Sequence, residues 1–205
     1  MNRKQHWESI YQTKAPYAFS WYQEKPHTSL SILDQLRVHH TAKIIDIGGG
    51  DSTFADHLLD RGYQNITVLD ISASAIERAQ RRLGERASKI TWIVADAAQF
   101  KPTMAYDFWH DRAAFHFLTD EQEVSNYIQA AQQGIVPGGI LVIGTFSEKG
   151  PTQCSGIEVK RYSARTMTNR LEGFFKKIKC LTTEHLTPFQ TVQQFVFCSF
   201  KKLSI

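Results

Sequence analysis

The sequence predicts an α/β fold built on one mostly parallel sheet with helices on both faces. From Lys43 onward, segments that read as buried strands alternate with segments of helical period, which is typical of parallel strands joined by crossover helices. A glycine cluster follows the first strand, at the sheet edge where such folds bind ligands. Two long strand-like runs, residues 174–185 and 191–202, close the chain and predict an antiparallel pair.

The five alternating strands are expected at residues 43–47, 66–69, 90–94, 106–110 and 140–145. Ser72 can cap the second crossover helix, and Gly84 can end it. Thr119 and Gln122 have the spacing of a capping box for the helix that precedes the fifth strand. Residues 137–139, Pro-Gly-Gly, are expected to form a turn before that strand, and residues 163–171 to form the last helix.

Length and composition indicate a single domain over residues 1–205, with a helical cap at 1–42 and the sheet core at 43–205. The net charge is +4, but lysines and arginines are scattered, so we expect solvated faces and no nucleic-acid partner. No run approaches the roughly 20 apolar residues of a membrane helix, and the polar start is unlike a secretory signal. These features favour the cytoplasm and leave the oligomeric state open.

The three cysteines, at positions 154, 180 and 198, are odd in number and far apart. This spacing argues against a disulfide framework and against a zinc site, so no metal is expected. Cys180 and Cys198 fall in the two terminal strand-like runs and are expected to be packing residues. Cys154 is expected in a loop that can face a substrate, although a buried, inert cysteine is the simpler interpretation.

The first strand ends in Asp46-Ile47-Gly48-Gly49-Gly50, which brings an acid and three glycines to the sheet edge. Glycines let the backbone approach a ligand closely, and the helix that follows offers free amide groups. A dinucleotide-binding loop would carry another glycine at the position of Thr53. Asp46 would also repel a pyrophosphate. The motif therefore favours a ligand with positive charge over NAD, which remains the alternative for this fold.

Two further acids end the next two strands. Asp70 lies 20 residues after Gly50, the spacing at which an acid reaches ribose hydroxyls, and Asp96 can accept a hydrogen bond from an exocyclic amine. Taken alone, the glycines can form a tight turn, Asp70 can begin a capping turn, and Asp96 can be a solvated acid. Their order along the chain, each at a strand end, favours one ligand site.

These motifs, with Ala95-Asp96-Ala97 and Pro137-Gly138-Gly139, resemble the class I S-adenosylmethionine-dependent methyltransferases from Lys43 to the C-terminus. The resemblance implies a Rossmann-like seven-stranded mixed sheet of order 3-2-1-4-5-7-6, with strand 7 antiparallel, and S-adenosylmethionine as the cofactor. It implies that the methionine part lies on the first motif, the ribose on the second, the adenine on the third, and the amino end at the residue after the fourth strand. The corresponding residues are Asp46, Gly48, Gly49 and Gly50; Asp70 and Ile71; Asp96 and Ala97; and Asp111.

Residues 7–22 and the stretch Asp111-Arg112-Ala113-Ala114-Phe115-His116-Phe117-Leu118 further resemble small bacterial methyltransferases of undefined substrate. His116 is the best candidate general base, because it follows the fourth strand and histidine titrates near neutral pH. His110 is a weaker candidate. Trp21 and Tyr22 can form an aromatic lid over a sulfonium, or can simply pack an N-terminal helix against the sheet.

The expected reaction is transfer of a methyl group to an oxygen, sulfur or nitrogen atom of a small molecule. An Asn-Pro-Pro-Tyr sequence, which by resemblance marks amino methylation of DNA bases and glutamine, is absent from the corresponding stretch at 111–114. Arg112 and Arg161 can bind an acidic substrate group, or can pair with Asp111 and Glu158. A protein-lysine methyltransferase and a catalytically silent cofactor-binding domain are the alternatives.

Overall fold

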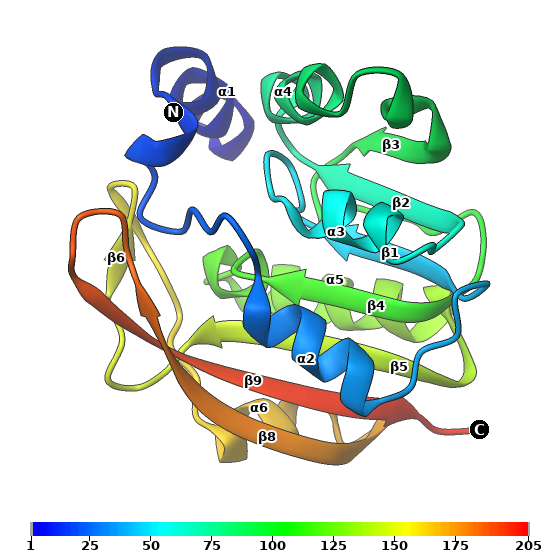
Figure 1. The fold of residues 1–205 in the computed structure, drawn as a ribbon. Coiled ribbons are helices and arrows are strands. Elements are labelled where there is room, and N and C mark those ends of the chain that lie inside the picture. The colour runs from blue at the N-terminus through cyan, green and yellow to red at the C-terminus, as the bar shows by residue number, and fades with distance from the viewer. Residues whose placement is uncertain (1, 205) are drawn as a thin grey trace.

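The computed structural model describes residues 2–204 and contains a seven-stranded sheet of order β3-β2-β1-β4-β5-β9-β8 (Figure 1). Neighbouring strands from β3 to β5 are parallel, whereas β9 is antiparallel to both β5 and β8. The expected sixth and seventh strands are therefore β8 and β9, and the predicted order is confirmed. The strands are β1 (Lys43–Ile47), β2 (Asn65–Asp70), β3 (Ile90–Val94), β4 (Tyr106–Arg112), β5 (Ile135–Phe146), β8 (Phe175–Leu186) and β9 (Val192–Lys202); β6 (Gln153–Cys154) and β7 (Ile157–Glu158) form a separate two-stranded sheet.

Helices cover both faces of the large sheet (Figure 1). Alternate side chains of a strand point to opposite faces, so Ile44 of β1 belongs to one apolar core and Ile45 to the other. The first core contains residues of α2 and α3, and the second contains residues of α5 and α6. The helices are α1 (Arg3–Thr13), α2 (His27–Gln35), α3 (Phe54–Asp60), α4 (Ala73–Leu83), α5 (Glu121–Gly134) and α6 (Ala164–Leu171), with short 3-10 turns η1 (Pro16–Ala18), η2 (Gly84–Lys89) and η3 (Phe115–Phe117).

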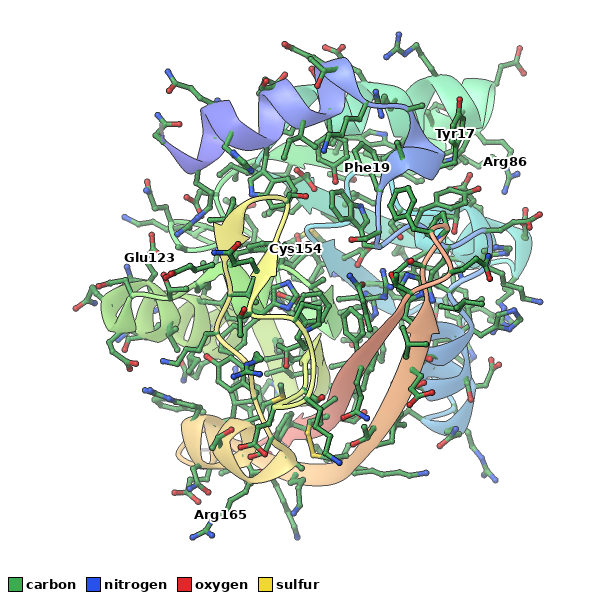
Figure 2. The ribbon with its side chains drawn as sticks, turned by 90° about the vertical axis from the view of Figure 1, so that its left-hand side faces the viewer. Tyr17, Phe19, Arg86, Glu123, Cys154 and Arg165 are labelled. Carbon is green, nitrogen blue, oxygen red and sulfur yellow. A yellow bond between two sulfur atoms is a disulfide. The ribbon has the colours of Figure 1, made fainter. Side chains whose placement is uncertain are left out.

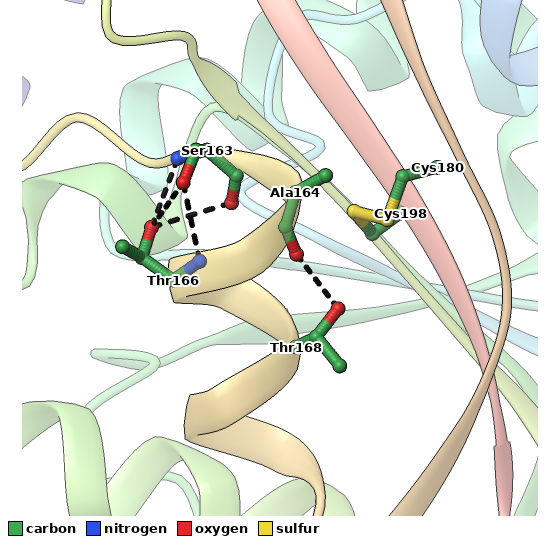
Figure 3. Close-up of a disulfide and its surroundings, with 6 residues drawn as sticks. All are labelled: Ser163, Ala164, Thr166, Thr168, Cys180 and Cys198. Carbon is green, nitrogen blue, oxygen red and sulfur yellow. Dashed lines mark hydrogen bonds between the residues drawn. A yellow bond between two sulfur atoms is a disulfide. The ribbon is translucent and has the colours of Figure 1, made fainter.

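Side-chain caps set the starts of four helices, among them α4, α5 and α6. Ser72 caps α4 by accepting a hydrogen bond from the Ala75 amide, as predicted. Ser163 and Thr166 form a reciprocal capping box at the start of α6 (Figure 3). The capping box predicted for α5 is wrong: α5 begins at Glu121, so Asp120 occupies the N-cap and accepts from the two amides that follow Glu121.

The turn predicted at residues 137–139 lies inside β5. This strand begins at Ile135, which pairs with Tyr106, and the register shifts before the next pair at Phe108. Gly138 has φ +76°, a left-handed conformation that glycine adopts without steric cost. The irregular pairing lets the chain turn locally without leaving the sheet.

The prediction that Cys180 and Cys198 are separate packing residues is wrong, because they form a disulfide (Figure 3). They are direct cross-strand partners in β8 and β9, with Cα atoms 4.1 Å apart. The hairpin explains the pairing: the two cysteines are equally far from Phe189, in the loop that joins the strands. Sequence separation alone concealed the pair, because antiparallel register brings distant residues face to face.

Candidate functional site

A cavity lies at the carboxyl ends of the central strands, beneath α1. Its lining includes residues from the ends of β1 and β2, from the segments after β3 and β4, and from the N-terminal segment. The structure therefore brings together most of the residues predicted from the three motifs. Among those predicted site residues, the cavity is lined by Asp46, Gly48, Gly49, Asp70, Ile71, Asp96, Ala97, Trp21 and His116, but not by Gly50 or Asp111.

The loop after β1 shows why its residues are glycines. Gly48 has φ +66°, a conformation that side chains disfavour. A Cβ atom on Gly49 would lie 2.5 Å from Oδ2 of Asp46, and one on Gly50 would lie 2.5 Å from Oδ2 of Asp70. Gly50 therefore serves the close packing of the loop against β2, while Gly48 and Gly49 open the backbone to the cavity.

Asp46 is buried and is held by a histidine on the neighbouring strand. His110 is its register partner in β4, and Nδ1 of His110 donates to Oδ1 of Asp46 over 2.6 Å. The other ring nitrogen lies 2.9 Å from the hydroxyl of Ser29 on α2. Both nitrogens of His110 are thus engaged, which favours a role in orienting Asp46 over a role as general base.

Asp70 is 4% exposed at the end of β2. Its Oδ1 accepts a hydrogen bond from the Ser72 amide at 2.8 Å, so Oδ2 is the oxygen left for a ligand. Burial raises the pKa of this carboxyl to about 7, and the negative charges of Asp46 and Glu8 act in the same direction. Such a group gains from hydroxyl donors and from positive charge, both of which the expected cofactor carries.

Asp96 lies after β3 and connects the adenine end of the predicted site to α1. Its Oδ1 accepts from the amide of Ala98 at 2.9 Å and shapes the loop. Arg3 of α1 lies 3.5 Å from the same carboxylate and also bonds Glu123 of α5. Arg3 thereby links the N-terminal helix to two elements across the cavity.

The N-terminal helix is also fixed by Glu8, which motif analysis did not single out. Its carboxylate accepts from the hydroxyl of Ser72 at 2.8 Å and from the amide of Ser74 at 3.1 Å, at the start of α4. Trp7 and Tyr11, from the same helix, line the cavity. Local motifs cannot reveal such pairings over more than sixty residues; the only sequence signal was the aromatic density of the first 42 residues.

The two aromatic residues predicted for a lid separate in the structure. Trp21 lines the cavity, stacks on Phe19 with ring centroids 4.6 Å apart, and meets Trp7 edge-on. Tyr22 is not among the residues of that cavity. Trp21 therefore lines the cavity in which the sulfonium is expected, and its lid role stays a prediction.

Asp111 organises the turn after β4. One carboxylate oxygen accepts from the amides of Ala114 and Phe115, and the other accepts from the Tyr127 hydroxyl at 2.8 Å. Burial raises its pKa to about 6, against the effect of these three donors. Both oxygens of its side chain are taken up by protein donors and Asp111 does not line the cavity, which argues against the predicted contact of this side chain with the cofactor's amino end.

His116 is fully buried in η3 beside the end of β5. Its Nδ1 accepts a hydrogen bond from the amide of Phe146 at 3.2 Å. A neutral imidazole with an accepting Nδ1 carries its proton on Nε2. Burial, reinforced by nearby Arg112, lowers the pKa of His116 to about 3. The ring therefore presents a donor, which is a weaker arrangement for a general base than for a hydrogen bond to a substrate.

Two arginines predicted as acid binders lie in different places. Arg112 ends β4 and lines the cavity, and Arg161 donates to the carbonyls of Glu148 and Gly150 outside it. Within residues 2–204, neither forms the ion pair with Asp111 or Glu158 that was the alternative. Cys154 lies on the short β6–β7 hairpin (Figure 2) and lines the same cavity as Arg112, buried and with a raised pKa.

Comparison with known proteins relates this architecture to methyltransferases. A family model described as a methyltransferase domain matches residues 44–139. The eEF1A lysine and N-terminal methyltransferase of Mus musculus is 31% identical over 58% of this chain, and malonyl-[acyl-carrier protein] O-methyltransferase 1 of Ilyobacter polytropus is 28% identical over 56%. The chain spans 17% and 43% of the lengths of these two curated relatives.

A solved structure extends the similarity to the full sheet. The N-methyltransferase NodS from Bradyrhizobium japonicum, in complex with S-adenosyl-L-homocysteine, aligns with a TM-score of 0.72 over 98% of this chain and 99% of its own, at 18% identity. The sheet order and the family match agree with the resemblance seen in the motifs. Residues 44–139, a little under half of the chain, match the methyltransferase domain family, and the sheet has the order expected for the class I S-adenosylmethionine-dependent methyltransferase fold.

Proposed function

We propose that this protein is an S-adenosylmethionine-dependent methyltransferase acting on an oxygen, sulfur or nitrogen atom of a small molecule. The observation that carries the proposal is the convergence of Asp46, Asp70 and Asp96 on one cavity, in the order expected for the three parts of the cofactor. The family match over residues 44–139 supports the same activity.

The residues present fit this cofactor. Asp46 and the backbone of Gly48 and Gly49 would hold its amino-acid part, because a glycine-lined turn beside a buried acid suits a positively charged ligand. Oδ2 of Asp70 would accept from the ribose, and Asp96 with the Ala97 backbone would contact adenine. When bound, the cofactor supplies a methyl group already activated by its sulfonium.

The task left to the protein is alignment and exclusion of water. Holding two reactants in line can lower a barrier by roughly 7–11 kcal/mol in favourable cases. Trp7, Tyr11 and Trp21 line the cavity, and Glu8 and Arg3 tie α1 to the elements around it. A covered, aromatic cavity strengthens electrostatic contacts inside it, so we expect the acceptor to react in a water-poor site.

The cavity lies beneath α1, which favours a small acceptor over a protein surface. The mouse relative is named for a lysine and N-terminal activity, and the bacterial relative for O-methylation of a carrier-bound group, so both acceptor classes occur among proteins with similar segments. A protein-lysine acceptor is therefore the second candidate.

Calorimetry with S-adenosylhomocysteine and with NAD tests the cofactor. We expect binding of the first and none of the second; tight NAD binding alone would remove the proposal. Turnover of methyl-labelled cofactor with a small-molecule library and with a protein extract then separates the acceptor classes. Cofactor binding without turnover of any acceptor would instead support a catalytically silent domain.

We also propose a cytoplasmic location. Among residues 2–204, no helix combines the length and apolar character needed to cross a membrane. Disulfides are uncommon in a reducing cytosol, so the state of Cys180 and Cys198 in extracts, trapped with a thiol-blocking reagent, tests this placement. A pair found fully oxidised in the cell would argue for an oxidising compartment.

A further inference from the structure

Two buried donors that line the cavity at and after the end of β4 have no hydrogen-bond partner among residues 2–204. They are Nη2 of Arg112 and Nε2 of His116, and both residues line the cavity. A buried donor without an acceptor costs free energy, and a buried cation without a counter-charge costs more. Two such groups in one cavity point to a ligand that brings the missing acceptors.

The orientation of the His116 ring is fixed by a hydrogen bond to Nδ1, the nitrogen opposite Nε2, which is unpartnered within the described part of the chain. The Phe146 amide occupies Nδ1, so the proton resides on Nε2. The ring also packs against Phe117 and Phe146, with centroids 4.6 Å away in each case, which restricts rotation. His116 is therefore a preset neutral donor.

Arg112 is likewise held in place while part of its guanidinium stays free. Nη1 donates to the Trp21 carbonyl at 3.1 Å, and Cζ lies 5.2 Å from the centre of the Phe195 ring. No carboxylate among residues 2–204 lies within ion-pair distance of this side chain. Burial lowers its pKa to about 10, so the group still carries its charge at neutral pH.

We propose that the methyl acceptor is a small acid whose carboxylate is bound by Arg112 and His116. The planar guanidinium matches a carboxylate, and a neutral N–H beside it supplies a second direction of approach. The apolar body of the acid would lie against Phe117, Phe146 and Phe195, which line the same cavity. This inference rests on the proposed methyl transfer and names its acceptor class.

The cofactor has a carboxylate of its own, which is the other source of the same chemistry. The places of Arg112 and His116 relative to the sheet favour the acceptor over the cofactor as the source of the bound carboxylate. The cofactor motifs end β1, β2 and β3, whereas the rings packed on Arg112 and His116 come from β9 and β5, on the other side of β4. The two donors therefore lie away from the predicted ribose and adenine contacts, and calorimetry on the variants separates the acceptor from the cofactor's amino-acid end, which is expected near Asp46 and Asp111.

The acceptor side is tested by thermal shift on the wild-type protein saturated with S-adenosylhomocysteine. The library pairs aromatic and aliphatic carboxylic acids, such as phenylacetate and hexanoate, each with its primary amide. We expect stabilisation by acids and not by the matched amides. Arg112→Met should weaken the binding of acids at least about tenfold, the scale of a hydrogen bond to a charged group. Hits that are mainly amides, or no acid hits at all, would overturn the proposal.

Variants at His116 distinguish a hydrogen-bond donor to the acid from a ring that serves only the structure. His116→Gln can keep a donor near Nε2, whereas His116→Asn can keep the acceptor for the Phe146 amide and removes the donor into the cavity. We expect acid binding to persist in the first and to fall in the second, with both proteins folded. Arg165→Met is the matched arginine control, since Arg165 is exposed on α6 and points away from the cavity (Figure 2).

Calorimetry on the same variants tests whether Arg112 instead binds the carboxylate of the cofactor. If Arg112 holds the acceptor, Arg112→Met binds S-adenosylhomocysteine within about threefold of wild type, an allowance of less than 1 kcal/mol. If it holds the cofactor's carboxylate, affinity for S-adenosylhomocysteine falls while affinity for 5′-methylthioadenosine, which lacks the amino-acid end, stays the same. That result overturns the inference and leaves the proposed function intact; failure of wild type to bind either ligand defeats the proposed function itself.

Discussion

Replacing Asp70 by asparagine should stabilise the apo protein at neutral and alkaline pH. Burial raises the pKa of Asp70 to about 7, against an ordinary value of 3.8. At about 1.4 kcal/mol for each pH unit between these values, ionising the buried group costs up to about 4 kcal/mol of folding free energy. Water entry or local motion reduces this figure. Asparagine retains an oxygen for the Ser72 amide and removes the charge.

The raised pKa of Asp70 fixes how the stability of the wild type changes with pH. In the wild type, the stability that the neutral acid provides is fully present below about pH 4 and is lost as pH rises through 7. The gap between Asp70→Asn and wild type should therefore open across this range and level off above it. Urea denaturation at pH 4, 6 and 8 measures the gap, with Asp96→Asn as a control at a less buried acid.

The same substitution should weaken S-adenosylhomocysteine binding by about 1.5–3 kcal/mol, because hydrogen bonds to a charged acceptor are lost. A more stable but poorly binding variant is the expected signature of an acid kept for function. A variant that is less stable than wild type at pH 8, or one that binds the ligand normally, would refute the reasoning about Asp70.

Three further outcomes are expected. Glu8→Gln should release S-adenosylhomocysteine several-fold faster in stopped flow, because the carboxylate that holds α1 to the serines of α4 loses its charge; unchanged release would argue against this tie. Cys180→Ser should lower the stability of the oxidised protein by about 3 kcal/mol, the scale for a loop of some 18 residues, without changing ligand affinity. Deleting residues 1–25 should leave a folded core with impaired turnover and faster ligand release; unchanged kinetics would exclude a lid.

The sequence was sufficient to predict the sheet, because the information there is local. Hydrophobic runs located β1 and β3 to the residue, and the acids and glycines at strand ends marked the ligand edge. Asp46 and Asp70 were found in this way, since the spacing between consecutive strand ends changes little when parallel strands are joined by short helices. Boundaries were less secure where pairing is irregular, as at Ile135.

The features that were missed depend on long-range pairing. Glu8 has no motif of its own and acquires a role only because α1 lies on α4. The Cys180–Cys198 bond follows from hairpin register, and the distance of each cysteine from the loop at Phe189 was the signal available. The internal hydrogen bonds of the Asp111 side chain could not be foreseen, because the Tyr127 hydroxyl that donates to it comes from a different element, α5.

The distribution of charge in the cavity bears on how little catalytic machinery the reaction needs. Asp46 and Asp70 lie at the end expected to hold a cationic donor, whereas Arg112 lies at the end proposed for an acid. Where the bound carboxylate is itself the nucleophile, transfer of a methyl group from the sulfonium removes both charges, which a water-poor cavity favours. A carboxylate nucleophile also carries no proton to be removed. No general base is then needed. The pKa of about 3 keeps His116 neutral, and its proposed role is to donate a hydrogen bond that positions the acid.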